Sequence, residues 1–219
     1  NSAKVKYVNE DDKFESFSVD YWLPLFGLSP KLGPIADWGL EIDKNPAIAP
    51  TLKWALRPSN ADFARLGHTW SQPQFAYVRI SGTITPVLVF GGGLDYAKYE
   101  TGGASATAGS GGDLGNAVYM INAKTGARIW WASSSAAGAG STTVAALKYS
   151  VPGAVRVIDK NGDGLADHLY FGDMGGQVFR VDLDNTNAAP NLVKRVALLA
   201  QLGNAETTGK VNDRRFYEM

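Results

Sequence analysis

The sequence predicts an all-β protein, a modified β-propeller built from four-stranded antiparallel blades. One observation is a unit of strand, turn, strand, glycine corner, strand, turn and strand, which is found twice along the chain as blades repeat in a propeller. A second is the composition of the strand-length segments, which are rich in β-branched and aromatic residues. Because a propeller closes with about 4–8 blades, we expect the chain to be a fragment of a longer protein.

Composition narrows the class of function. The 219 residues are 45% hydrophobic, which is enough for one sizeable core or two small ones. The 21 basic and 21 acidic residues cancel, so no excess charge argues for a nucleic-acid partner or a membrane surface. The absence of Cys excludes disulfides and thiolate metal sites. The chain shows no signal peptide and no apolar run of membrane-spanning length.

The N-terminal fifty residues carry the weakest pattern. Residues 1–20 are mostly polar and are compatible with a strand and a solvated connection over residues 9–13. Residues 20–50 are irregular, because five prolines interrupt any regular element there. This stretch is either a long loop or a set of pieces that are not contiguous, and the residues leave both alternatives open.

The first clear blade spans about residues 66–131, and a strand at residues 51–56 precedes it. Its strands are predicted at residues 75–80, 86–90, 117–122 and 128–131. A glycine corner at residues 91–93 separates the second strand from the third. Residues 96–114 read as a long insertion of small residues, and residues 133–141 as another loop.

The second clear blade, about residues 147–200, repeats the first. Residues 149–152, 169–172 and 175–182 repeat the patterns of residues 70–73, 88–91 and 115–122. The two copies differ at the turn of residues 81–82, which the second copy replaces with the loop 159–167. We therefore treat residues 1–219 as part of a single propeller domain.

The loop 159–167 has the ligand order of a calcium site. Oxygen donors fall at alternate positions, from the side chains of Asp159, Asn161, Asp163 and Asp167 and the backbone carbonyl of Leu165. A calcium ion takes six to eight oxygens at about 2.3–2.6 Å, and the helical EF-hand loop supplies them in this order. Gly164 stands where that loop needs a residue free to adopt a positive φ.

The flanks of the loop differ from an EF-hand. Residues 155–158 and 168–171 are strand-like, and Tyr170 occupies the position of the bidentate Glu. We therefore predict a strand–loop–strand hairpin that binds one Ca²⁺ with an affinity of about 10⁻⁶–10⁻³ M. The alternative is a metal-free turn, since Asp, Asn and Gly are also the ordinary turn residues.

Three stretches carry a resemblance to a known family. They are SVP at residues 150–152, IDKNGDGLADHLYFGD at residues 158–173 and GQVFRVDL at residues 176–183. Together they resemble the C-terminal propeller of the PilY/PilC-type tip proteins of bacterial type IV pili. LGHTWSQP at residues 66–73 and GNAVYMINA at residues 115–123 look like the preceding blade of that domain. The match covers roughly residues 50–219.

The resemblance implies a quinoprotein-dehydrogenase-like propeller with one calcium ion at the five positions named above. It implies an extracellular protein at the pilus tip or outer membrane, with minor pilins and host surface receptors as partners. Such proteins support pilus biogenesis, control extension and retraction in twitching motility, and contribute to cell adhesion and virulence. On this reading the chain is not an enzyme.

Two other functions stay open at this point. A quinoprotein-type dehydrogenase would hold its quinone over a calcium ion, but such a site more often collects ligands from several blades than from one contiguous loop. Fold analogy alone does not carry that activity. An integrin-like propeller also uses calcium loops of this length to brace hairpins beneath a receptor-binding face. The sequence does not separate this module from the pilus protein.

Four features receive a structural interpretation. His68 and His168, the only histidines, lack a nucleophile pattern around them, so we expect structural or surface positions. Asp173 follows a strand at a glycine corner, so we expect it to accept hydrogen bonds from backbone N–H groups of that turn. We expect the six Trp side chains to pack between blades.

Overall fold

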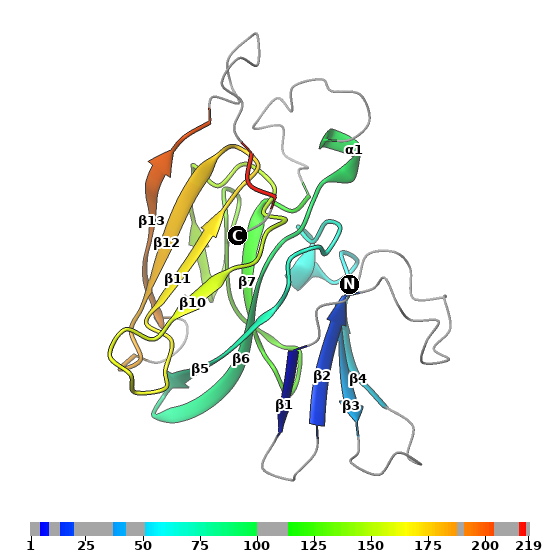
Figure 1. The fold of residues 1–219 in the computed structure, drawn as a ribbon, viewed down its shortest axis with the longest axis vertical. Helices are drawn as coiled ribbons and strands as arrows, with labels where there is room; N and C mark the ends of the chain where they lie inside the picture. Colours follow the sequence, from blue (N-terminus) through cyan, green and yellow to red (C-terminus); the bar gives the residue numbers. More distant parts are fainter. Residues whose placement is uncertain are drawn as a thin grey trace.

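A computed structural model describes residues 5–8, 14–19, 37–42, 51–99, 114–187, 191–203 and 215–217. Its strands form three sheets, which are shown in Figure 1. The N-terminal sheet is an antiparallel meander of β1 (Val5–Val8), β2 (Phe14–Val19), β3 (Asp37–Ile42) and β4 (Thr51–Leu56). No helix among the described residues has the length and hydropathy to cross a membrane.

The middle sheet has five strands. They are β5 (Gln74–Ile80), β6 (Thr83–Gly91), β7 (Ala117–Asn122), β8 (Arg128–Ser133) and β9 (Ser141–Thr143). The first four form an antiparallel meander, whereas β9 pairs with β8 in parallel. Two short helices accompany this sheet, the 3₁₀ helix η3 (Ala61–Phe63) before it and α1 (Tyr96–Tyr99) after β6.

The C-terminal sheet is a second four-stranded antiparallel meander. Its strands are β10 (Arg156–Ile158), β11 (His168–Gly172), β12 (Gln177–Leu183) and β13 (Val193–Gln201). The register is continuous across β11 and β12, where Phe171 stands opposite Phe179. Two irregularities interrupt the pairing of β12 with β13.

The described strands confirm an all-β fold in which each sheet contains a four-stranded antiparallel meander, to which the middle sheet adds the parallel strand β9. Each sheet is open, so closure into a propeller stays a prediction. Two strands differ from expectation. β3 lies inside the stretch 20–50 that reads as irregular, and β9 overlaps the end of the loop 133–141. The connection 9–13 and residues 100–113 of the expected insertion lie outside the described residues.

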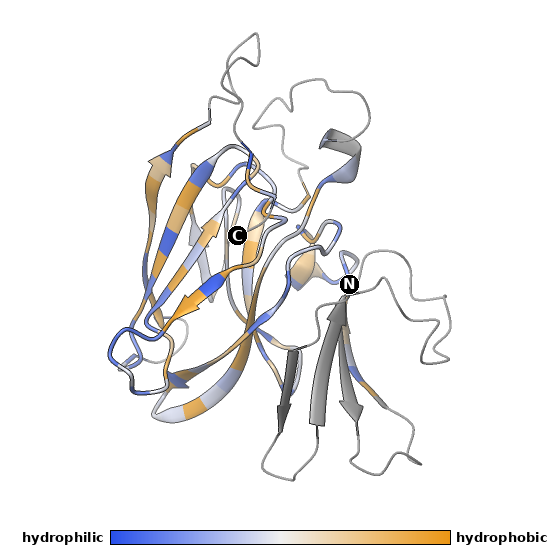
Figure 2. Cartoon of the chain, in the orientation of Figure 1, coloured by the Kyte–Doolittle hydropathy of each residue, from blue (hydrophilic) through white to orange (hydrophobic). Residues whose placement is uncertain are grey.

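The main core lies between the middle and C-terminal sheets. Its centre is formed by apolar side chains that both sheets bury: Val78, Val87, Val89, Val118, Met120, Trp130, Leu169, Phe171, Phe179 and Val181. The rings of Phe171 and Phe179 stack with centroids 5.1 Å apart. β12 alternates between buried and half-buried residues, and the alternating colours along it in Figure 2 show this one-sided pattern.

The middle sheet is covered on both faces. Five of the six residues of β7 are fully buried, so this strand reads as a continuous apolar run rather than an alternating one. Its second face packs against Leu56 of β4 and against Phe63 and Leu66 beyond it. Tyr119 of β7 belongs to this second core and stacks on Trp131 at a centroid distance of 5.9 Å.

The glycine corner lets the two sheets approach each other closely. Gly93, with φ of +92°, donates its N–H to the carbonyl oxygen of Val151 at 3.0 Å. Val151 in turn donates to the carbonyl of Gly115 at 2.9 Å. A Cβ on Gly91 would overlap the carbonyl oxygen of Val151, so a side chain there would push the two sheets apart.

The tryptophans divide between packing and surface. Trp130 is buried between the two sheets, Trp131 packs on the opposite face, and the indole N–H of Trp54 donates to the carbonyl of Ala123 at 3.1 Å. These three agree with packing between sheets. Trp70 does not, because half of its surface is exposed in the segment before β5. The side chains of Trp22 and Trp38 lie outside the described part of the chain.

We predict that Phe171→Ala destabilises the fold by about 3–5 kcal/mol, because it leaves a cavity between two sheets that cannot collapse fully. Urea unfolding followed by intrinsic fluorescence measures the change. Ile84→Ala is the matched control, since Ile84 is 52% exposed and its truncation should cost less than about 0.5 kcal/mol. Equal losses in the two variants would contradict this placement of the core.

Candidate metal-binding loop

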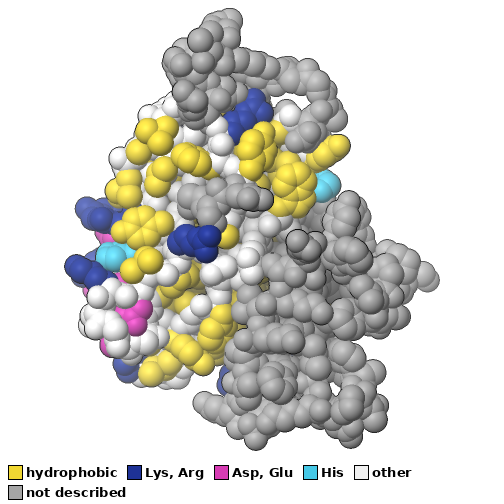
Figure 3. All heavy atoms as spheres, in the orientation of Figure 1, with side chains coloured by type: hydrophobic (Ala, Val, Ile, Leu, Met, Phe, Trp, Pro, Cys, Tyr) yellow, Lys and Arg dark blue, Asp and Glu magenta, His cyan; other side chains and the backbone are white. Residues whose placement is uncertain are grey.

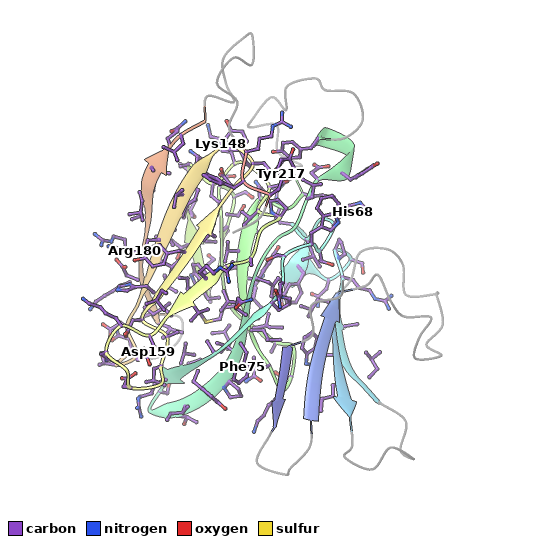
Figure 4. The ribbon with its side chains drawn as sticks, in the orientation of Figure 1. His68, Phe75, Lys148, Asp159, Arg180 and Tyr217 are labelled. Carbon is purple, nitrogen blue, oxygen red and sulfur yellow. The ribbon has the colours of Figure 1, made fainter. Side chains whose placement is uncertain are left out.

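The loop 159–167 connects β10 to β11 and projects from one end of the C-terminal sheet, at the lower left of Figure 1. The backbone N–H of Asp167 donates to the carbonyl of Ile158 at 2.9 Å, which closes the hairpin at its base. Residues 159–164 are exposed, whereas Leu165 and Ala166 are buried. The loop therefore has an open first half and an anchored second half, and Figure 4 marks Asp159 at its start.

Every side chain that the sequence assigns as a ligand accepts a hydrogen bond from the loop. The bonds run to Asp159 Oδ1 from Gly162 N (2.7 Å), Asp159 Oδ2 from Gly164 N (2.8 Å), Asn161 Oδ1 from Asp163 N (2.9 Å), Asp163 Oδ1 from Leu165 N (2.9 Å) and Asp167 Oδ2 from Lys160 N (2.8 Å). The bonds to Asp159, Asn161 and Asp163 are Asx-type bonds, in which a short polar side chain accepts from the backbone that follows it, whereas Asp167 accepts from Lys160, which precedes it in the loop. The same residues therefore shape the loop.

Two glycines make the winding possible. Gly164 has φ of +84°, as the ligand order predicts, and Gly162 has φ of +78°. A residue with a Cβ is strained at these angles, whereas glycine is not. Both glycine N–H groups point at the carboxylate of Asp159.

The electrostatics of Asp159 follow from these bonds. The backbone N–H of Gly164 is the largest influence and, with that of Gly162, it holds the pKa of the Asp159 carboxyl below its usual value. Asp159 is therefore ionised at neutral pH, which is the state that a bound cation requires.

The donor set fits a hard cation such as Ca²⁺, because it offers oxygen and neither nitrogen nor sulfur. An oxygen that accepts one N–H keeps a second lone pair, so the backbone bonds and a cation do not exclude each other. The side chains of Asn161 and Asp163 are already in contact, with Nδ2 donating to Oδ2 at 3.2 Å. Among the described residues, however, no three or more His, Cys, Asp or Glu side chains gather closely enough to hold a metal. Calcium binding by this loop stays a prediction.

The second half of the loop is held by hydrogen bonds to segments that are distant from it in sequence. Ala166 donates its N–H to the carbonyl of Tyr77 in β5 at 2.8 Å. Its own carbonyl accepts from Asn185 Nδ2 at 2.9 Å. Asn185 lies in a turn after β12 whose Asp and Asn residues carry no signal beyond ordinary turn chemistry. Sequence reasoning therefore missed it.

A charged cluster lies across β11, β12 and β13 of the C-terminal sheet, and its member His168 follows the loop directly in sequence. Asp182 Oδ1 lies 3.0 Å from His168 Nδ1 and 2.7 Å from Arg180 Nε, and Asp182 Oδ2 lies 2.7 Å from Arg195 Nη2. Burial acts to raise the pKa of Asp182, but the hydrogen bonds from Arg195 and Arg180 outweigh it and leave this pKa lowered. Figure 3 shows basic, acidic and His side chains gathered together on this face of the molecule. The contact with Asp182 gives His168 the structural role expected of it.

His68 and Asp173 lie away from the loop. The ring centroids of His68 and Tyr96 are 5.5 Å apart, and Figure 4 labels His68. Asp173 is buried at the turn between β11 and β12, where Oδ1 accepts from Gly175 N at 2.9 Å and from Gln177 N at 3.0 Å. This confirms the expected capping of the turn. Burial nevertheless raises the pKa of Asp173 to about 7, against the lowering by both amides.

The comparisons with known proteins give a fold and no family. No protein-family model matches the chain. The crystal structure of the Pseudomonas aeruginosa PilY1 C-terminal domain is similar over 90% of this chain, with a TM-score of 0.56 and 17% sequence identity. At that identity the likeness shows a shared fold alone. The chain spans 35% of the length of that structure.

Ferredoxin–NADP reductases are among the curated proteins that match, over short stretches of this chain. A ferredoxin–NADP reductase of Flavobacterium johnsoniae is 58% identical over 38 residues, which are 17% of this chain and 11% of the reductase. Ferredoxin–NADP reductase 1 of Christiangramia forsetii is 51% identical over 45 residues, which are 20% of this chain and 13% of the reductase. The chain spans about a tenth of these reductases, so the likeness assigns no activity to it.

We predict that the Asp173 carboxyl makes the protein less stable as the pH rises. Its pKa is higher in the folded chain than in the unfolded chain, so the stability it contributes is full below about pH 4 and is lost as the pH approaches 7. Asp173→Asn keeps an oxygen acceptor for both amides and should remove this dependence. The measurement is the free energy of unfolding in urea between pH 4 and pH 8. Over this range it should fall by roughly a few kcal/mol more in the unchanged protein than in Asp173→Asn.

Asp184→Asn serves as a control of opposite sign. Lys194 is the largest influence on Asp184 and lowers the pKa of that carboxyl, so its contribution is lost as the pH falls. If Asp173→Asn left the pH slope unchanged, the burial of Asp173 would not govern its ionisation.

Proposed function

We propose that this chain is part of the β-propeller of a type IV pilus-associated surface protein and that its loop 159–167 binds one calcium ion. The observation that carries the proposal is the coincidence of two independent features. The fold is similar to that of the PilY1 C-terminal domain, and an oxygen-donor loop in EF-hand order joins two strands of one sheet. The likeness of fold alone would not support a function.

The packing of the sheets supports a propeller. The middle sheet is buried on both faces, as a blade between two neighbours would be. The C-terminal sheet buries one face, and its other face presents half-buried residues such as Tyr170, Val178 and Arg180. That face has the mixed apolar and charged character that a further blade would cover.

Calcium would act on the shape of the loop. The ion would neutralise Asp159, Asp163 and Asp167 and fix the open half of the hairpin between β10 and β11. A ligand that binds only the ordered loop stabilises that conformation by mass action. Calcium would therefore fix the shape of the surface that other pilus components bind. We propose minor pilins and host surface receptors as these partners, and the pilus tip or outer membrane as the location.

We propose a binding role without catalysis. All five candidate ligands come from one hairpin at the end of a sheet, where residues 159–164 are exposed. A quinoprotein-type dehydrogenase, in contrast, needs its calcium beside a bound quinone and a base. The pilus role comprises biogenesis, control of extension and retraction, and adhesion, with twitching motility and virulence as its consequences.

We predict that calorimetry of the protein shows one calcium ion bound with a Kd of about 10⁻⁶–10⁻³ M. Asp159→Ala should abolish this binding while the circular dichroism stays the same. Lys160→Ala is the matched control, because Lys160 lies in the same exposed half of the loop and its side chain offers no oxygen. No binding by the unchanged protein at millimolar calcium would reduce the loop to a turn.

We also predict a phenotype for the full-length protein in the bacterium that encodes it. Replacement of the chromosomal copy by Asp159→Ala should reduce surface pili and twitching, because the loop would no longer respond to calcium. Electron microscopy of pili and the width of twitching zones measure the effect, with Lys160→Ala as the strain that behaves normally. Unchanged piliation together with lost calcium binding would separate the ion from the pilus role.

A further inference from the structure

The buried residue Ala166 links three segments that are distant in sequence. Its N–H donates to the carbonyl of Tyr77 in β5 of the middle sheet at 2.8 Å. Its carbonyl accepts from Asn185 Nδ2, in the turn after β12, at 2.9 Å. Ala166 is 2% exposed, so water does not compete for these bonds.

Asn185 completes the link with its other side-chain atom. Its Oδ1 accepts the backbone N–H of Arg79 in β5 at 2.9 Å. One amide therefore bonds to the loop through Nδ2 and to the middle sheet through Oδ1. This position requires a side chain with both a donor and an acceptor. Asp and Leu have a similar volume, but neither supplies both groups.

The geometry joins the loop to a contact between sheets. Tyr77 and Arg79 lie on β5, at one edge of the middle sheet, and Asn185 lies in the turn between β12 and β13 of the C-terminal sheet. The predicted ligands Leu165 and Asp167 flank Ala166 directly. Asp167 is fixed as well, since its carbonyl accepts from Leu183 N at 2.9 Å. A movement of these ligands would therefore move the junction of the two sheets.

We propose that Asn185 is the positioning residue that couples the calcium loop to β5 of the neighbouring sheet. It holds the backbone of residues 165–167 in place and transmits the order of the loop to the edge of the middle sheet. Calcium then tightens a junction between two sheets rather than a hairpin alone. This inference rests on the proposed calcium binding and goes beyond it, because it names the element that responds to the ion.

The test compares unchanged protein with Asn185→Ala, by calorimetry with CaCl₂ and by hydrogen exchange of the Arg79 amide with and without calcium. In the unchanged protein, calcium should slow the exchange of Arg79 N–H at least several-fold. In Asn185→Ala the calcium Kd should rise at least fivefold, and calcium should no longer affect Arg79. Thr186→Ala is the matched control, because Thr186 is exposed in the same turn and bonds to Asp184.

A second variant guards against simple loss of folding. Asn185→Asp keeps the acceptor for Arg79 N and replaces the donor to Ala166 with a carboxylate oxygen, which repels the Ala166 carbonyl, so it should retain basal protection of Arg79 and lose its calcium dependence. The added negative charge by itself favours a cation, so a weaker calcium affinity in this variant reports the lost donor.

The outcomes separate the two proposals. If the unchanged protein binds no calcium, the proposed function fails and this coupling fails with it. If it binds calcium and both Asn185 variants bind with the same Kd and the same change at Arg79, the coupling alone is overturned. Equal weakening by Thr186→Ala would also overturn it, since the effect would then belong to the whole turn.

Discussion

The burial of apolar side chains between the middle and C-terminal sheets is the constraint on which the other features depend. The alternation of β12 places Phe179 and Val181 on one face, and these belong to the same buried cluster as Val118 and Met120 of β7. Glycine at residue 91 lets the backbones approach until Gly93 and Val151 share a hydrogen bond. A close-packed core of this kind is stiff and transmits small displacements. It therefore holds in place the end of the C-terminal sheet from which the loop projects.

The oxygens that shape the loop are also those that we propose as calcium ligands. Asx-type hydrogen bonds from its own backbone shape it and keep Asp159 ionised. A hard cation would use the remaining lone pairs of those oxygens. The anchored half, from Leu165 to Asp167, is fixed by the surrounding sheets. In the proposed function, a cation would order the exposed half of the loop against the half that these hydrogen bonds hold.

Two aspartates of the C-terminal sheet show how far environment decides charge. Asp182 is surrounded by Arg180, Arg195 and His168, and its pKa is lowered although burial opposes this. Asp173 has only amide partners and is buried, so its pKa rises to about 7. The cationic partners of Asp182 offset the cost of removing a charge from water, and neutral amides offset less of it.

Local features of the chain could be predicted from the sequence. These are the strand periodicity, the glycine corner, the capping by Asp173 and the positive φ of Gly164. Each depends on the conformational preferences of a few neighbouring residues and needs no contact with a distant segment. The tertiary structure decided the rest: the strand β9, the exposure of Trp70, the partners of Asp182 and the link from Ala166 through Asn185 to β5. These depend on segments as far apart as residues 79 and 185 meeting in space, and an Asn in an Asp- and Asn-containing turn carries no local mark of its distant partner.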